Sequence, residues 1–164
     1  MKSLRLTLTV LGLSIVLGAG AWAQAPSAAD QKNLQAMIDA ARKDLRTEKQ
    51  SILDQAMGLE AGDKAKFWGL YSGFQKELDA IWDVRIANVK KYAETYTSMN
   101  DAGADQLAVS GLSNEKQLTA LKQKYYGQFK TAMGAKVAAR WLQAETAINN
   151  LAMLQLLAQL PLMQ

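Results

Sequence analysis

The chain has 164 residues, contains neither cysteine nor histidine, and carries a formal net charge of +4 at pH 7. Without cysteine a disulfide framework is excluded, and without histidine the commonest general base and the commonest transition-metal ligand are missing. The charge is also too evenly balanced for a dedicated nucleic-acid binder, in which a basic face dominates the affinity.

Residues 1–23 have the features of a secretory signal peptide. Lys2 and Arg5 form a basic start, an apolar stretch follows, and residues 21–23 (Ala-Trp-Ala) supply the small-x-small pattern that signal peptidase recognises. A membrane anchor would need about 20 uninterrupted apolar residues, which Arg5 and the glycines prevent. We therefore expect cleavage after Ala23, export to the periplasm and no stable membrane insertion.

The remaining part, residues 24–164, is expected to form a single all-helical domain. Lys2 and Arg5 account for two of the 19 basic residues, so 17 remain against 15 acidic ones. Proline occurs in this part only at positions 26 and 161, and no segment has the alternating pattern of a strand. The first helix is expected over residues 27–57, with a start that resembles a capping box and Gly58 as its stop.

The second helix, expected over residues 61–96, is the longest. At 1.5 Å per residue it would extend about 54 Å, far beyond the usual three or four turns. Apolar residues recur along it in steps of mostly three and four, which predicts a buried seam. With two positions of the last helix, the predicted core seam comprises Phe67, Tyr71, Phe74, Leu78, Ile81, Trp141 and Ile148.

The third helix is expected from Asn100, which can cap its first turn, to about Thr131, and the fourth from Gly134 to Pro161. The fourth helix has no charge after Glu145 and is apolar on more than one face. We expect an elongated four-helix hairpin or bundle with one long central helix. Because that helix is hard to cover within one small domain, and the uncharged last stretch offers further surface, we also expect a homodimer.

Two tryptophans lie one position off the predicted seam, at its flank. Trp68 and Trp82 could be half-buried packing residues or could line an exposed binding groove. We predict them as contact residues for partner proteins, together with the nearby basic residues Lys122 and Lys124. The basic residues between positions 116 and 140 scatter around the helix, so most of them indicate a solvated surface.

No residue pattern indicates an enzyme. Ser113 and Lys116 match the short S-x-x-K pattern of acylating serine enzymes, but the accompanying motifs are missing, so two exposed polar residues explain them better. Asp79 and Asp83 lie one turn apart, and two carboxylates alone make a poor cation site. We expect no catalytic residue, no metal and no cofactor.

Three stretches of the chain resemble a known group of proteins. They contain Phe67, Trp68, Tyr71 and Phe74, then Lys136, Arg140, Trp141, Gln143 and Glu145, and finally residues 159–162 (Gln-Leu-Pro-Leu). With these stretches the overall plan is similar to periplasmic stress proteins of the Spy/CpxP type, which are known for LTxxQ motifs, and more closely to a group of uncharacterised exported bacterial proteins related to them. Neither LTxxQ motif is intact in this chain.

The resemblance implies an elongated, curved helical dimer. In Spy-like proteins the concave face holds unfolded clients without ATP, whereas relatives restrain a sensor kinase or bind metal. We therefore expect a periplasmic ATP-independent holdase-type chaperone or envelope stress protein that binds unfolded proteins. The alternative is a signalling adaptor that docks on an inner-membrane sensor protein.

Overall fold

The computed structural model describes residues 48–157, with side chains as far as residue 154, and nearly all of this range is helical. Residues 48–57 are helical, and they are followed by α2 (Ala61–Thr95), the short 3-10 helix η1 (Tyr96–Ser98), α3 (Asp101–Met133) and α4 (Ala135–Leu157). The described part contains no strand, so the all-α prediction is confirmed. The predicted signal peptide, its cleavage site and the start of the first helix lie outside the described residues.

The ends of the long helices follow from local capping. α2 begins after Glu60, whose backbone is extended, and Asp63 in its first turn faces the positive end of the helix dipole. Asn100 caps α3 as predicted, because its Oδ1 accepts a hydrogen bond from the backbone N–H of Gly103 at 2.9 Å. Gly134 separates α3 from α4 with φ of 87°, a value that glycine adopts without strain.

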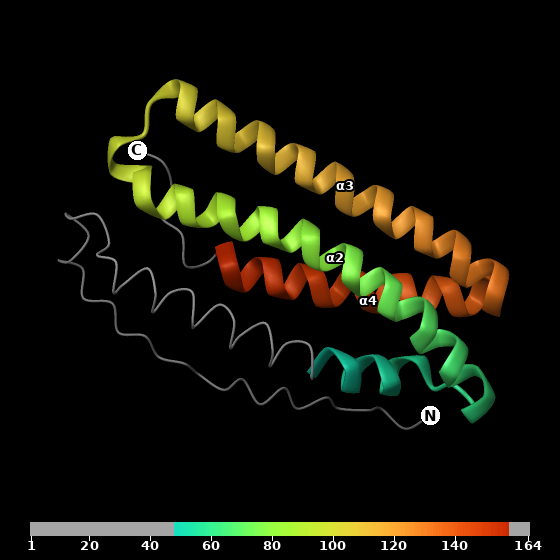
Figure 1. Cartoon of the computed structure of the whole chain (residues 1–164). Coiled ribbons are helices and arrows are strands. Elements are labelled where there is room, and N and C mark those ends of the chain that lie inside the picture. Colours follow the sequence, from blue (N-terminus) through green and yellow to red (C-terminus); the bar gives the residue numbers. More distant parts are fainter. Residues whose placement is uncertain (1–47, 158–164) are drawn as a thin grey trace.

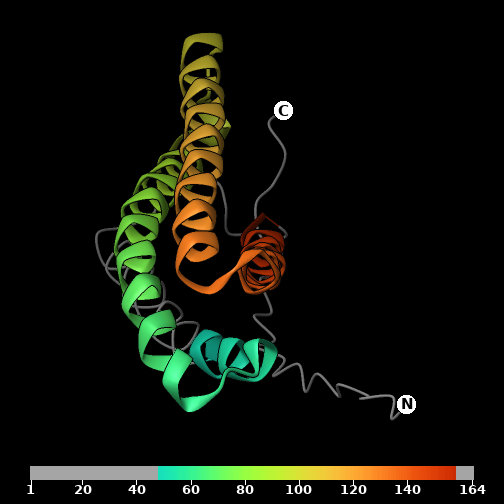
Figure 2. The same ribbon diagram turned by 90° about the vertical axis from the view of Figure 1, so that its right-hand side faces the viewer.

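α2 and α3 lie side by side and antiparallel, and α4 turns back along them (Figure 1). The view from the side places the helical residues 48–57 at the end of the molecule where α2 begins (Figure 2). α2 and α3 have 35 and 33 residues, whereas α4 has only 23. Since α4 starts beside the end of α3, it runs out before it reaches the other end of the α2–α3 pair.

The hydrophobic core lies where residues 48–57, α2, α3 and α4 meet. All the residues of the predicted core seam are buried there, together with residues of the first helix and of α3. Trp141 of α4 is fully buried, with its ring centroid 5.0 Å from that of Phe74 and 4.5 Å from that of Phe129. Such aromatic pairs add to the free energy of burial. Phe74 therefore connects α2 with α4 at the centre of the core.

Phe74→Ala is expected to lower the free energy of unfolding by about 3–5 kcal/mol, because it leaves a cavity at a fully buried position. The matched control is Leu112→Ala, since Leu112 is 72% exposed; it should change stability by no more than about 0.5 kcal/mol. Urea unfolding followed by circular dichroism measures both. Equal effects of the two substitutions would contradict this placement of the core.

Candidate functional site

Trp68 and Trp82, the two predicted contact tryptophans, are half-buried against the core. Trp68 packs edge-on against Phe67 and Tyr71, with ring centroids 5.1 and 5.3 Å apart. Trp82 donates a hydrogen bond from Nε1 to Asn149 Oδ1 of α4 at 3.3 Å. Each tryptophan thus has packing partners within the fold and also keeps part of its surface in solvent.

Lys122 and Lys124, the two predicted contact lysines, take part in separate interactions. Lys122 is half-buried and donates from Nζ to Thr146 Oγ1 of α4 at 3.4 Å. Desolvation by burial lowers the pKa of Lys122, although nearby Glu145 acts in the opposite direction. Lys124 is exposed and pairs with Glu77 of α2 at 2.6 Å. Trp82 and Lys122 both contact α4, whereas Lys124 contacts α2, so the structure does not gather the four predicted residues into one surface.

Glu77 also accepts a hydrogen bond from the Tyr125 hydroxyl at 2.8 Å. The hydrogen bonds from Lys124 and Tyr125 lower the pKa of Glu77. Burial and the bond to Glu77 raise the pKa of Tyr125 to about 12. This partly buried cluster joins α2 to α3 and leaves its charged groups paired.

Sequence reasoning missed a buried polar network centred on Glu145 of α4. Lys49 Nζ donates to Glu145 Oε1 at 2.6 Å, and the two side chains are only 6% and 0% exposed. The hydroxyl of Tyr71 lies 3.3 Å from Glu145 Oε2, and the Asn149 amide donates to the same carboxylate. Burial, followed by the charge of Glu145, raises the pKa of Tyr71. The network therefore connects residues 48–57, α2 and α4.

The sequence does contain a signal for this network, although it is indirect. Glu145 follows Trp141 by four positions and precedes Ile148 by three, so the helical period places it on the apolar face of α4. Lys49 precedes Leu53 by four positions on the face of its own helix that is buried. A charged residue at an apolar position of a helix predicts a buried partner. Which partner it has, 96 positions away, requires the structure.

The groups of the network are bonded to one another. The Glu145 carboxylate already accepts hydrogen bonds from Lys49 and Asn149, and Lys49 also donates to Gln75 at 3.2 Å. Within residues 48–157, no group of three or more acidic residues has the spacing to hold a metal ion. Asp79, considered above as a cation ligand, accepts a hydrogen bond from Gln75 at 2.9 Å.

Lys49→Met is expected to lower the free energy of unfolding by about 3–5 kcal/mol, because it leaves the buried Glu145 carboxylate without its counter-charge. The double variant Lys49→Met with Glu145→Gln should recover part of that loss, since no charge then remains buried. The control is Lys64→Met, which removes the exposed ion pair with Asp54 and should cost less than about 1 kcal/mol. Urea unfolding measures all three variants. A double variant no more stable than Lys49→Met would argue against a buried charge as the cause.

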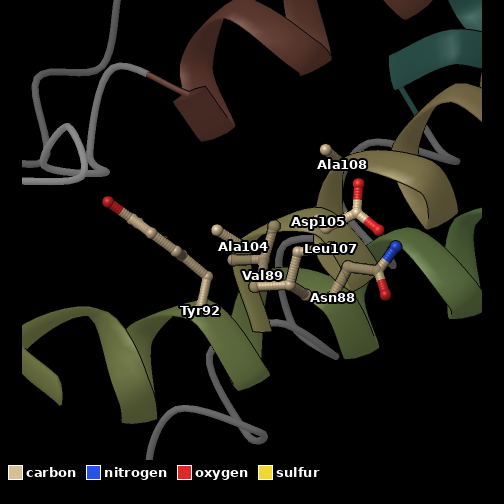
Figure 3. A pocket seen from close by; sticks show the side chains of 7 residues that line it. All are labelled: Asn88, Val89, Tyr92, Ala104, Asp105, Leu107 and Ala108. Atoms are coloured by element: carbon tan, nitrogen blue, oxygen red, sulfur yellow. The ribbon is translucent and has the colours of Figure 1, made fainter. Parts of the chain in front are cut away.

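An apolar groove lies between α2 and α3, near the C-terminal end of α2. It is a shallow, mostly open depression of about 510 Å³. Figure 3 shows the side chains that line it, which come from both helices. The residues that line the groove are Asn88, Val89, Tyr92, Ala104, Asp105, Leu107 and Ala108.

Asn88, Tyr92 and Asp105 carry the polar groups of the groove lining. The Asn88 amide donates to Ser110 Oγ at 2.8 Å, which joins α2 to α3. Asp105 is exposed. The rest of the lining is aliphatic or aromatic, and Val109 and Leu112 expose further apolar surface on the same half of α3, at 56% and 72%. Apolar surface in an open groove is typical of a binding site.

No protein-family model, curated protein or solved structure matches the chain. In the stretch from position 48 to position 157, none of the helices is both long enough and apolar enough to cross a membrane.

Proposed function

We propose that the protein is a periplasmic, ATP-independent holdase that binds apolar segments of unfolded exported proteins in the groove between α2 and α3. The observation that supports this proposal is the groove itself, an open apolar hollow on two long helices. The resemblance to Spy-like proteins noted in the sequence points to the same class of function by analogy alone.

Physical considerations favour an unfolded chain as the ligand. Unfolded proteins expose apolar side chains, whose transfer out of water is favourable without any directional requirement. The groove is formed by helices that the core already holds in place, so little conformational entropy is lost at the binding surface. Its lining is mostly aliphatic, with few hydrogen-bonding groups to select one sequence. Such a surface suits many clients better than a single partner.

Trp68, Trp82, Lys122 and Lys124 stay predicted contact residues. Both tryptophans and Lys122 are partly exposed, and Lys124 is exposed. With a net charge of +2 expected for residues 24–164, attraction of anionic clients would act over a Debye length, about 8 Å in physiological salt.

The homodimer also stays a prediction.

The test compares two alanines of α3 that are both exposed, Ala108 in the groove and Ala120 outside it. Ala108→Glu places a charge where an apolar client segment would be buried, which costs binding free energy. Wild-type protein at several-fold excess should suppress the aggregation of a reduced secreted protein, measured by light scattering. Ala108→Glu should lose most of this protection, whereas Ala120→Glu should keep it, and both should melt at nearly the wild-type temperature.

Absence of protection by the wild-type protein would show that the holdase proposal is wrong. The signalling adaptor would then be the leading hypothesis, and it predicts binding to one inner-membrane sensor and indifference to unfolded proteins. Equal protection by the two glutamate variants would instead show that clients bind elsewhere, with the surface around Trp68 and Trp82 as the next candidate.

A further inference from the structure

We infer that two copies of this chain pair through the outer face of α3, with their α3 helices antiparallel about a two-fold axis that passes between positions 110 and 111. The inference assigns a surface to the homodimer expected from the sequence, and it does not rest on the holdase function. Figure 1 shows α3 at the edge of the molecule, and among the described long helices it contacts α2 and α4.

The outer face of α3 is defined by four exposed residues, Asp105, Val109, Leu112 and Lys116. Steps of four, three and four positions place them on one side of the helix. Val109 and Leu112 are 56% and 72% exposed, so two apolar side chains stand in solvent at the middle of this face. Exposed apolar surface with a polar rim is typical of a protein interface.

The two charged residues of the outer face have opposite signs. Asp105 lies one turn before Val109, and Lys116 lies one turn after Leu112. Within the described range, no ion pair joins Asp105 or Lys116 to another side chain. The outer face therefore has an acidic end, an apolar centre and a basic end.

This order makes the outer face complementary to itself. The midpoint between Asp105 and Lys116 falls between positions 110 and 111, and so does the midpoint between Val109 and Leu112. A two-fold axis at that point brings Asp105 of each copy to Lys116 of the other, and it brings the apolar residues together in the same way. Parallel helices in register would instead place equal charges side by side, which is repulsive. The charges therefore favour the antiparallel pair.

The size of the contact predicts a weak dimer. With this axis, residues 101–120 of the two helices overlap over a length of about 30 Å. Ala102 and Ala120, near the ends of the overlap, are small and exposed, so they allow the helices to approach closely. Only two large apolar side chains per copy become buried, which is few for a permanent dimer. We expect a dissociation constant on the order of micromolar.

Exchange of the two charges tests the axis directly. Asp105→Lys alone, or Lys116→Asp alone, places like charges opposite each other at both ends of the contact. Each variant should therefore have a dissociation constant at least about tenfold higher than the wild-type protein. An equimolar mixture of the two variants restores opposite charges at both ends and should pair with nearly the wild-type affinity. Sedimentation velocity over the micromolar range measures the masses.

The matched controls, Glu94→Lys and Lys66→Asp, make the same changes of charge at exposed positions of α2 and should pair as the wild-type protein does. Thermal melting of dilute samples checks that every variant is folded. Because pairing adds to stability as the protein concentration rises, Leu112→Ala should melt below the wild-type protein in concentrated samples. As a stability control, Leu112→Ala therefore applies to dilute protein, in which the dimer is dissociated.

A wild-type protein that stays monomeric over the whole range would leave the outer face to solvent or to a different protein, and it would overturn the inference. Single variants that pair as the wild-type protein does would overturn it as well, because two copies would then meet elsewhere. If the single variants and their mixture are all monomeric, the antiparallel axis is wrong. Assemblies larger than a dimer would exclude a closed two-fold contact. Protection of clients is measured separately, so failure of the holdase function would leave these results unchanged.

Discussion

The difference in length between α4 and the α2–α3 pair is the constraint on which the rest of the structure depends. α4 has 23 residues, against 35 and 33 in its two neighbours, and it starts beside the end of α3. Where the three helices overlap, large aromatic side chains such as Phe74, Phe129 and Trp141 fill the space between them. Near the C-terminal end of α2 the same two helices line the groove. The same two helices thus contribute to the core and to the groove.

The Lys49–Glu145 pair determines how α4 sits in this arrangement. A buried ion pair is a weak source of net stability, because desolvation offsets the attraction between the charges. Its geometry is demanding, however, since displacement of either helix would leave a buried charge without a partner. Glu145 has partners in residues 48–57 and in α2, and Asn149 connects the next turn of α4 to Trp82. These contacts fix the register of α4, and hence the position at which it ends beside the groove.

The all-α class, the bounds of α2 and the Asn100 cap could be predicted from the sequence, because periodicity and capping are local properties. The groove could not be predicted. Val89 and Tyr92 belong to the same helical period as Phe74 and Leu78. Phe74 and Leu78 lie in the core, whereas Val89 and Tyr92 line the groove, and this difference depends on the position of α4. Trp68 and Trp82 illustrate the same difficulty, because a position on the flank of a seam fits both packing and exposure. Lys49 and Glu145 are 96 positions apart, so no local sequence pattern could predict that these two residues form a pair.

Hydrogen exchange of backbone amides, with and without an unfolded client, tests the central claim most directly. Since local opening of a helix depends on what covers it, a bound client should slow exchange in the helical turns that it contacts. The account predicts slower exchange around residues 88–92 of α2 and 104–108 of α3, and unchanged exchange around Phe74 in the core. Slower exchange confined to the turns around Trp68 and Trp82, or no change in either helix, would contradict the groove as the client-binding surface.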